Sequence, residues 1–191
     1  YNLESRQTEL RYSKKNILVI GQVDEDLSIN YGANYVKNNF EFLKKVRFDF
    51  PDKYIIYKPH PDYESGLRSS SSANKDMHLY ADKIIKKASI IDALHLADIV
   101  VVNTSLSGFE ALIRDKEVVC YGEPFYSGWG LTKDMYVESI KSRRNRKLLL
   151  EELMYGCLVI YPNYFHPETY ESIEIEEAIQ LMSTEKPRNL F

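Results

Sequence analysis

The sequence predicts an α/β fold: a doubly wound parallel sheet with helices on both faces. Two observations carry this prediction. Short apolar runs rich in β-branched residues recur at 16–20, 54–58 and 99–102, and such runs are typical of strands buried on both faces. Segments with helical spacing of apolar residues separate these runs. The order of strand, helix, strand, helix and strand is that of a parallel sheet with crossover helices.

The first part of the chain begins with a polar and charged segment, 1–15, which we expect to be an arm or a linker. Residues 16–20 predict a central strand, and the acidic segment 22–28 predicts a loop at its carboxyl end. Residues 34–50 have near-helical spacing of apolar side chains and predict a helix. Residues 54–58 predict the second strand, which ends because two prolines follow.

The rest of the chain continues this alternation. Ser89 is a favourable N-cap for the helix after it. In chain order, the pattern predicts a loop over 63–74, a short strand over 82–86, a helix over 90–97, a strand over 99–102, a helix over 109–113, a strand over 118–121, and helices over 148–159 and 173–182. We find no internal repeat and no domain boundary, so we expect one domain over 16–183 and a polar tail over 184–191.

The composition argues against several classes of protein. The 191 residues are 44% hydrophobic and 28% charged, which is ordinary for a globular domain with a core. The net charge of −3 gives no reason to expect a nucleic acid partner. Cys120 and Cys157 are expected to be buried thiols, since two cysteines make no disulfide framework. No apolar run approaches ~18 residues, no signal-peptide pattern is found, and the start at Tyr1 suggests a piece of a longer protein.

The segment 103–131 carries the first candidate site. Its small, hydroxyl-rich start, 104–108, joins a predicted strand to a predicted helix. Such a junction directs backbone N–H groups and the positive end of a helix dipole toward the carboxyl edge of the sheet, where an anion binds. Simple capping of the helix by Ser105 is the alternative. We expect a phosphate to be bound by the hydroxyls of Ser105 and Ser107 and the N–H groups of Gly108 and Phe109.

A second candidate lies at the end of the second predicted strand, in Lys58-Pro59-His60-Pro61. The two prolines restrict the backbone, so the His60 ring is held in one direction. An imidazole beside a lysine suits a phosphate, because His60 donates a hydrogen bond or a proton and Lys58 adds charge. The alternative is a rigid turn with a solvated histidine. The serine-rich turn after the neighbouring strand favours the functional interpretation.

Further candidates each have a structural alternative. Glu110 suits ribose hydroxyls, or it complements the helix dipole. The aromatic loop 122–130 suits stacking on a base or covering a sugar, or it plugs the core. The polar residues after the first predicted strand offer a carboxylate base or a ligand for a sugar hydroxyl, or they form a solvated turn; they are Gln22, Asp24, Glu25 and Asp26. The basic run 143–147 is most often a solvated face, although an anionic polymer or a membrane surface is the other possibility.

Metal chemistry is not expected. His78, His95 and His166 are scattered, and no Cys or His pair has ligand spacing. The sequence also has no Walker lysine motif, no GxGxxG motif and no nucleophile elbow.

Several of these segments together resemble the capsular polysaccharide β-Kdo transferases of the KpsC type. The similarity extends over roughly residues 16–169, and the long aromatic loop is its most specific part. Departures are small: Asp115-Lys116-Glu117 stands where the family tends to have Gly-Lys-Pro, and the serine run 69–72 looks local. The matching segments are Gln22 to Ser28, Tyr57 to Pro61, Ser105 to Leu112, Tyr121 to Thr132 and Leu158 to Pro162.

The resemblance implies a Rossmann-like lobe of a two-lobed GT-B glycosyltransferase. Such enzymes use CMP-Kdo, retain the donor's stereochemistry, and build the poly-Kdo linker on a phosphatidylglycerol lipid that anchors Gram-negative capsules. This chain corresponds to the carboxyl-side, donor-binding lobe, and no metal or other cofactor is implied. Its implied partners are the CMP-Kdo donor, a lipid-linked saccharide acceptor and the missing amino-side lobe, which is expected to carry catalytic carboxylates. We expect a cytoplasmic location with at most a peripheral contact at the inner membrane.

The resemblance also assigns expected roles. His60 and Asp26 are the expected catalytic residues. His60 and Lys58 hold the CMP phosphate and stabilise the leaving group, while Gln22 and Asp26 face the sugar. Glu110 holds the ribose, and Tyr126 and Trp129 wall the pocket. The remaining expected donor-binding residues are Pro61, Ser105, Ser107, Gly108, Phe109 and Gly130.

Two other functions stay open at this point. A non-catalytic interaction module of the capsule export machinery predicts no nucleotide affinity and a large apolar surface patch. A sugar-nucleotide epimerase lobe of the same architecture predicts a preference for UDP over CMP.

Overall fold

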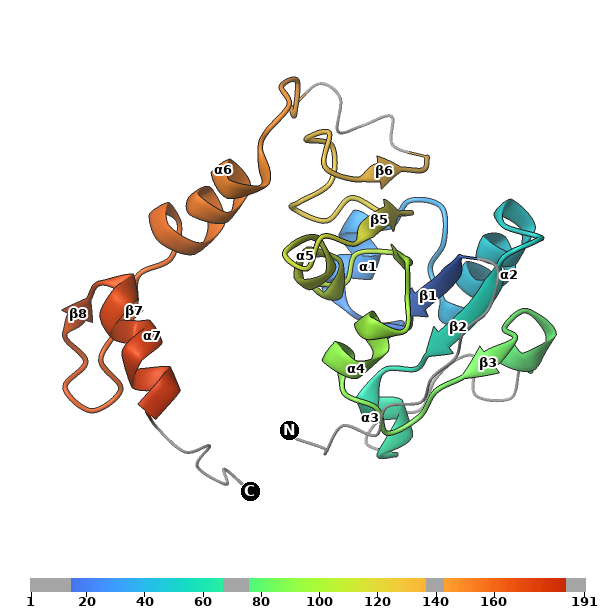
Figure 1. Cartoon of the computed structure of the whole chain (residues 1–191), viewed down its shortest axis with the longest axis horizontal. Coiled ribbons are helices and arrows are strands. Elements are labelled where there is room, and N and C mark those ends of the chain that lie inside the picture. The colour runs from blue at the N-terminus through green and yellow to red at the C-terminus, as the bar shows by residue number, and fades with distance from the viewer. Residues whose placement is uncertain (1–14, 67–75, 137–142, 185–191) are drawn as a thin grey trace. The chain divides into compact units, whose positions relative to one another are not determined.

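The computed structural model describes residues 15–66, 76–136 and 143–184 (Figure 1). The chain forms two compact units, one ending at Leu148 and the other starting at Leu149. This boundary lies inside the range 16–183 that the sequence led us to expect as one domain. Residues 1–14 of the expected arm over 1–15, the serine run 69–72 and residues 185–191 of the expected tail lie outside the described residues.

The first unit is built on a parallel sheet. Its strand order is β3-β2-β1-β4-β5-β6, and every neighbouring pair is parallel. The chain therefore moves outward from β1 to β3 and then returns to place β4 on the other side of β1. This reversal is the topological switch point at which open α/β sheets bind ligands. The strands are β1 (Asn16–Ile20), β2 (Tyr54–Lys58), β3 (Lys83–Ile84), β4 (Ile99–Val102), β5 (Glu117–Cys120) and β6 (Lys133–Asp134).

Helices cover both faces of this sheet. The helical elements of the first unit are α1 (Leu27–Gly32), α2 (Asn39–Asp49), α3 (Pro61–Glu64), the 3₁₀ turn η1 (Met77–Leu79), α4 (Ile90–His95) and α5 (Ser107–Leu112). On one face, Phe42, Leu43 and Val46 of α2 pack in a buried cluster with alternate residues of the central strands. On the other face, α5 packs against β4 and β5, and Figure 1 shows α4 on that side as well. The predicted doubly wound α/β fold is therefore confirmed.

The central strands are buried from end to end, which explains why they were recognised. All residues of β1 and β4 are buried, as are all but the first of β2 and β5. The strands lie within two residues of their predicted bounds, whereas α2 begins at Asn39 instead of residue 34. The expected loop 22–28 also differs, because α1 begins within it at Leu27, with Asp26 as its N-cap.

The second unit contains helices and a short hairpin. Its elements are α6 (Leu150–Tyr155), the π-helical turn η3 (Gly156–Ile160), the antiparallel pair β7 (Tyr164–Phe165) and β8 (Ser172–Ile173), and α7 (Ile175–Thr184). The helices predicted over 148–159 and 173–182 correspond to α6 with η3 and to α7. The hairpin had no sequence signal that we recognised. Across the described residues, no helix combines the length and the apolar character that crossing a bilayer needs.

Candidate functional site

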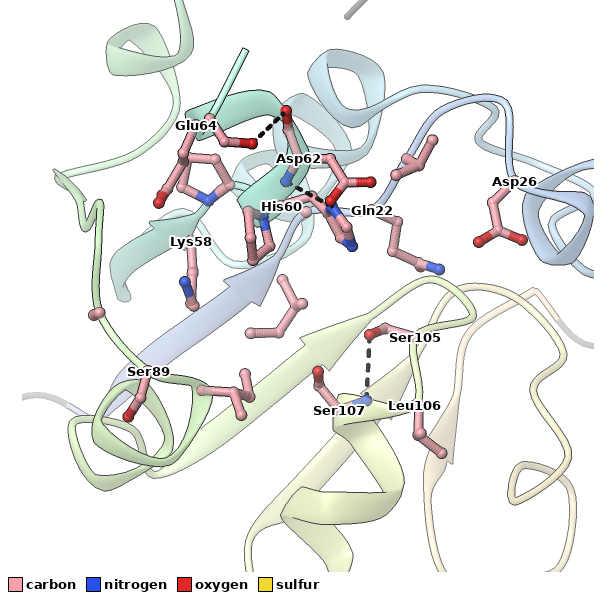
Figure 2. A pocket seen from close by; sticks show the side chains of 18 of the residues that line it. Gln22, Asp26, Lys58, His60, Asp62, Glu64, Ser89, Ser105, Leu106 and Ser107 are labelled. Atoms are coloured by element: carbon pink, nitrogen blue, oxygen red, sulfur yellow. Dashed lines mark hydrogen bonds and ion pairs between the residues drawn. The ribbon is translucent and has the colours of Figure 1, made fainter. Parts of the chain in front are cut away.

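A cavity of about 910 Å³ lies at the carboxyl edge of the sheet, around the ends of β1, β2 and β4 (Figure 2). Its walls come from α3, from the connection 87–89 into the start of α4, and from the turn 104–107 before and into α5. Ligand pockets typically have volumes of about 300–1,000 Å³. The two strand ends that the sequence singled out, after β2 and after β4, therefore do converge on one space.

Lys58 is the buried cation of this cavity. It is the last residue of β2, pairs in register with Ile20 of β1, and is only 5% exposed. Within the described residues its ammonium makes no hydrogen bond and no ion pair with another side chain. Burial lowers the pKa of Lys58, and the negative charge of Glu64 opposes that change. A buried cation without a direct partner is costly, so an anionic ligand in the cavity would relieve it.

His60 lies near the middle of the cavity (Figure 2). It is the N-cap of α3, and its Nδ1 accepts a hydrogen bond of 3.2 Å from the Asp62 N–H. In a neutral imidazole this assigns the proton to Nε2, which leaves Nε2 as the donor for a ligand. Pro61 follows as the first residue of α3, a position that tolerates proline because that N–H has no helical partner. The segment therefore forms a rigid turn and also lines the cavity, so the two interpretations of it do not exclude each other.

Gln22 lines the cavity, but its amide is already engaged. Its Nε2 donates to Thr104 Oγ1 at 3.0 Å, and its Oε1 accepts from the Thr104 N–H at 2.8 Å. This pair of hydrogen bonds joins the ends of β1 and β4 directly across the switch point. Gln22 is therefore brought to the cavity as expected, with polar atoms that hold the wall together.

Asp26 lies toward the opposite end of the cavity from Lys58 (Figure 2). Its Oδ1 caps α1 by accepting from the Ser28 N–H at 2.8 Å. The side chain is exposed, which suits a carboxylate that accepts hydrogen bonds from a polar ligand. Nearby, Asp24 is bound by Asn39, whose backbone N–H and Nδ2 donate to its Oδ1 at 2.9 and 2.7 Å.

The serine turn differs from the phosphate cradle that the sequence suggested. Ser105 and Ser107 both line the cavity, and Ser105 Oγ accepts from the Ser107 N–H at 3.2 Å. The N–H of Gly108 donates to Ser105 O at 3.1 Å, and the N–H of Phe109 donates to Leu106 O at 2.9 Å. Because the first turn of α5 uses these N–H groups itself, the two serine side chains are what the turn offers to a ligand.

Six residues of the expected donor site do not line this cavity: Gly108, Phe109, Glu110, Tyr126, Trp129 and Gly130. Tyr126 is completely buried, and its hydroxyl donates to the backbone oxygen of Ser105. Trp129 Nε1 donates to Phe125 O at 2.8 Å. The structural alternative for the aromatic loop is thus the one that its contacts favour, since its polar atoms are bonded within the first unit.

One residue of the basic run 143–147, Arg144, has a structural role. Arg144 Nη1 donates to the backbone oxygens of Pro124 and Ser127, both at 2.7 Å, and its guanidinium lies over the Trp129 ring. Arg143 and Arg146 are exposed, as the solvated-face interpretation of this run requires.

The structure adds cavity residues that the sequence did not single out for binding: Glu64, Lys87, Ser89 and Thr104. Glu64 follows His60 by four residues, so a helix that begins after His60 places both on one side, and this spacing was the available signal. Ser89 was recognised only as a helix cap. Thr104 belongs to the hydroxyl-rich start of the first candidate, but no signal in the sequence pointed to its pairing with Gln22, 82 residues away.

The described part of the chain contains no group of three or more His, Cys, Asp or Glu side chains placed to hold a metal ion. That the function needs no metal stays a prediction.

The strand order and the cavity at the switch point define a Rossmann-like α/β lobe, with its cavity at the carboxyl edge where sheets of this kind bind ligands. The chain belongs to the capsule polysaccharide biosynthesis protein family, whose model matches residues 2–164. The family indicated by the sequence motifs is therefore confirmed.

Curated relatives agree with this assignment. The capsule polysaccharide modification protein LipA of Neisseria meningitidis serogroup B is 46% identical over 187 residues, which are 97% of this chain and 26% of that protein. The lipopolysaccharide-processing protein LpsZ of Rhizobium meliloti is 38% identical over 180 residues, 93% of this chain and 40% of that protein. The chain thus spans between a quarter and two fifths of these relatives.

Solved structures give the same family and the same fold. The β-Kdo 2,7 transferase of Thermosulfurimonas dismutans KpsC matches with a TM-score of 0.78 and 46% identity, over 90% of this chain and 53% of that one. The β-Kdo 2,4 transferase of the same KpsC also has a TM-score of 0.78, with 28% identity, over 93% of this chain and 55% of that one. The chain is therefore a lobe related to Kdo transferases, and it spans about half of each solved chain.

Proposed function

We propose that this chain is the donor-binding lobe of a retaining β-Kdo glycosyltransferase, which takes Kdo from CMP-Kdo and adds it to a lipid-linked saccharide in capsule assembly. The observation that carries the proposal is Lys58. It is a buried ammonium that faces a cavity at the switch point and has no direct partner among the described residues. The solved neighbours named as Kdo transferases support Kdo as the transferred sugar. The anion that we propose for the cavity is the cytidine monophosphate of the CMP-Kdo donor.

The proposed chemistry uses polar side chains that line the cavity. Breaking the bond between the sugar and CMP leaves negative charge on the phosphate. Lys58 stabilises that charge, and Nε2 of His60 donates a hydrogen bond to it. The hydroxyls of Ser105 and Ser107 complete the binding of the phosphate. Asp26, at the other end of the cavity, accepts hydrogen bonds from hydroxyls of the sugar.

The linkage is part of the proposal. The identity of 46% to the β-Kdo 2,7 transferase, against 28% to the 2,4 transferase, favours a 2,7 linkage for the product of the whole protein. The acceptor site and further catalytic groups belong to the amino-side lobe of the same module. Binding of the donor's nucleotide is the part of the activity that we expect from this chain alone.

Isothermal titration calorimetry with CMP tests the proposal. We expect wild-type protein to bind CMP, and His60→Ala and Ser107→Ala each to weaken binding by about tenfold or more, because each removes a hydrogen bond to the charged phosphate, which contributes about 1.5–3 kcal/mol. Lys44→Ala, an exposed lysine on α2, is the control and should bind as wild type does.

The outcomes separate the proposal from its alternatives. Absence of CMP binding, or binding that neither His60→Ala nor Ser107→Ala weakens, contradicts it. Tighter binding of UDP than of CMP favours an epimerase lobe. A folded protein that binds neither nucleotide favours an interaction module without donor binding.

A further inference from the structure

Glu64 lies in the same cavity as Lys58, and the two side chains are at the same end of it (Figure 2). Glu64 ends the four-residue helix α3, which begins directly after His60. None of the roles assigned above involves this carboxylate. Its two oxygens nevertheless have different surroundings, and the difference indicates what the residue does.

One oxygen of Glu64 is fixed. Oε2 accepts a hydrogen bond of 2.9 Å from the backbone N–H of Lys87. Lys87 has a φ of 55°, a left-handed conformation that is costly for a residue with a side chain. The hydrogen bond therefore holds a strained residue in the connection that leads to Ser89 and α4. It joins two walls of the cavity, α3 and the segment 87–89.

The other oxygen has no such partner. Oε1 of Glu64 is buried and, among the described residues, accepts no hydrogen bond. No ion pair within 4 Å joins Glu64 to Lys58 in the described chain, although the two charges interact at longer range. Since Oε2 is held by Lys87, the carboxylate is kept from closing onto the ammonium. A direct ion pair would occupy the cation that an anionic ligand needs.

We propose that Glu64 is a positioning residue which, held by the Lys87 N–H, keeps Lys58 positively charged without pairing with it, so that Lys58 stays available to an anionic ligand. The identity of that ligand as the phosphate of a cytidine nucleotide rests on the proposed function. The effect of Glu64 on Lys58 does not rest on the proposed function.

The burial of Lys58 is the reason why a negative charge nearby matters. Burial alone lowers the pKa of Lys58, and the charge of Glu64 is the named influence that raises it. Removing only the charge of Glu64 should therefore release the proton of Lys58 at lower pH. The ionisable side chains that line the cavity are Asp26, Lys58, His60, Asp62, Glu64 and Lys87. A comparison of two variants at each pH cancels the titration of the groups that they share.

The variant Glu64→Gln separates charge from geometry, because its side-chain oxygen still accepts from the Lys87 N–H. CMP affinity is measured by calorimetry from pH 6.5 to 9.5 for wild type, Glu64→Gln and the control Glu41→Gln, an exposed site on α2. At pH 6.5, Glu64→Gln should bind within about threefold of wild type. As the pH is raised toward 9.5, Glu64→Gln should bind progressively more weakly than wild type, because its Lys58 loses its proton at lower pH.

A parallel loss of affinity at every pH would mean that Glu64 is only structural, and it overturns the inference. A second measurement does not depend on nucleotide binding: the titration midpoint of Lys58, followed by NMR of the ¹³Cε atoms of labelled lysines. We expect this midpoint to lie at lower pH in Glu64→Gln than in wild type. An unchanged midpoint overturns the inference, whereas a lowered midpoint in a protein that binds no CMP overturns the proposed function alone.

Discussion

Two regions at the carboxyl edge of the sheet, the end of β2 with α3 and the loop 122–130 after β5, both carried sequence motifs that suggested a ligand. Their polar groups are used in opposite ways. At the end of β2, the Lys58 ammonium and Nε2 of His60 have no hydrogen-bond partner among the described residues. In the loop, the polar atoms of Tyr126 and Trp129 donate to backbone oxygens. The first region can therefore take up a ligand, and the second is part of the framework.

The loop still acts on the site, but indirectly. Tyr126 donates to the backbone oxygen of Ser105, the same oxygen that accepts from the Gly108 N–H at the start of α5. Arg144 in turn donates to two backbone oxygens of the loop. The distinctive residues of the loop thus fix the turn that presents Ser105 and Ser107. A specific motif can be explained by support of a site as well as by contact with a ligand.

The largest effect that would test this contrast is expected at Gly122, where the loop begins. A Cβ there would lie 2.6 Å from Gly32 O and 2.7 Å from Thr104 Cγ2, so backbone has to move. Gly122→Ala should lower the free energy of unfolding by about 2–3 kcal/mol, as overpacking of a tight site does. Urea unfolding followed by circular dichroism measures it.

Gly156→Ala is the matched control, because a Cβ at that position meets nothing within 4 Å. It should leave stability unchanged or slightly higher, since alanine favours helix. If Gly122→Ala unfolds at the same urea concentration as wild type, the loop is not held as tightly as its contacts indicate.

Tyr126→Phe should have a smaller effect on stability and little on binding. It removes a buried hydroxyl and leaves the Ser105 oxygen with one donor fewer, which costs about 1–2 kcal/mol. CMP affinity should change by no more than about twofold, because Tyr126 does not line the cavity. Thermal unfolding and calorimetry, with the exposed Tyr155→Phe as control, separate the two effects. A tenfold loss of affinity at unchanged stability would instead support the expectation that Tyr126 walls the pocket.

The sequence sufficed for the parts of this molecule that depend on local pattern. Fully buried runs such as 16–20 and 99–102 indicated strands, and they led to the sheet and to the edge at which open α/β sheets bind ligands. Lys58 and His60 were found because they lie at the carboxyl end of a strand pattern. Short elements were missed when their pattern was weak: α1 has only six residues and one buried residue, Ile29.

Long-range contacts explain what the sequence could not decide. Whether Tyr126 faces a ligand or the framework depends on a hydrogen bond to Ser105, 21 residues earlier. Gln22 was expected to face the sugar, yet its amide is bound to Thr104, 82 residues away. The boundary after Leu148 was also hidden, because helical spacing of apolar residues continues from 148 through 159 without interruption.

Lys58→Met should have the smallest effect on stability and the opposite sign. Replacing a buried cation that has no direct partner with an apolar chain of similar length should raise the free energy of unfolding by up to about 1 kcal/mol at pH 7. CMP binding should be lost at the same time. A gain in stability joined to a loss of binding is what distinguishes a site residue from a framework residue such as Tyr126.

The pH dependence of that gain follows from the lowered pKa of Lys58. Between its pKa in the folded state and 10.5, the unfolded chain binds more protons at this lysine than the folded protein does, so wild-type stability rises with pH in that window. Lys58→Met lacks this contribution, and its advantage should shrink as the pH approaches 10.5. Urea unfolding at pH 7, 8.5 and 10 measures the trend, with exposed Lys44→Met as control. A variant that is less stable than wild type at pH 7 would show that Lys58 supports the fold, and the contrast between the two regions would fail there.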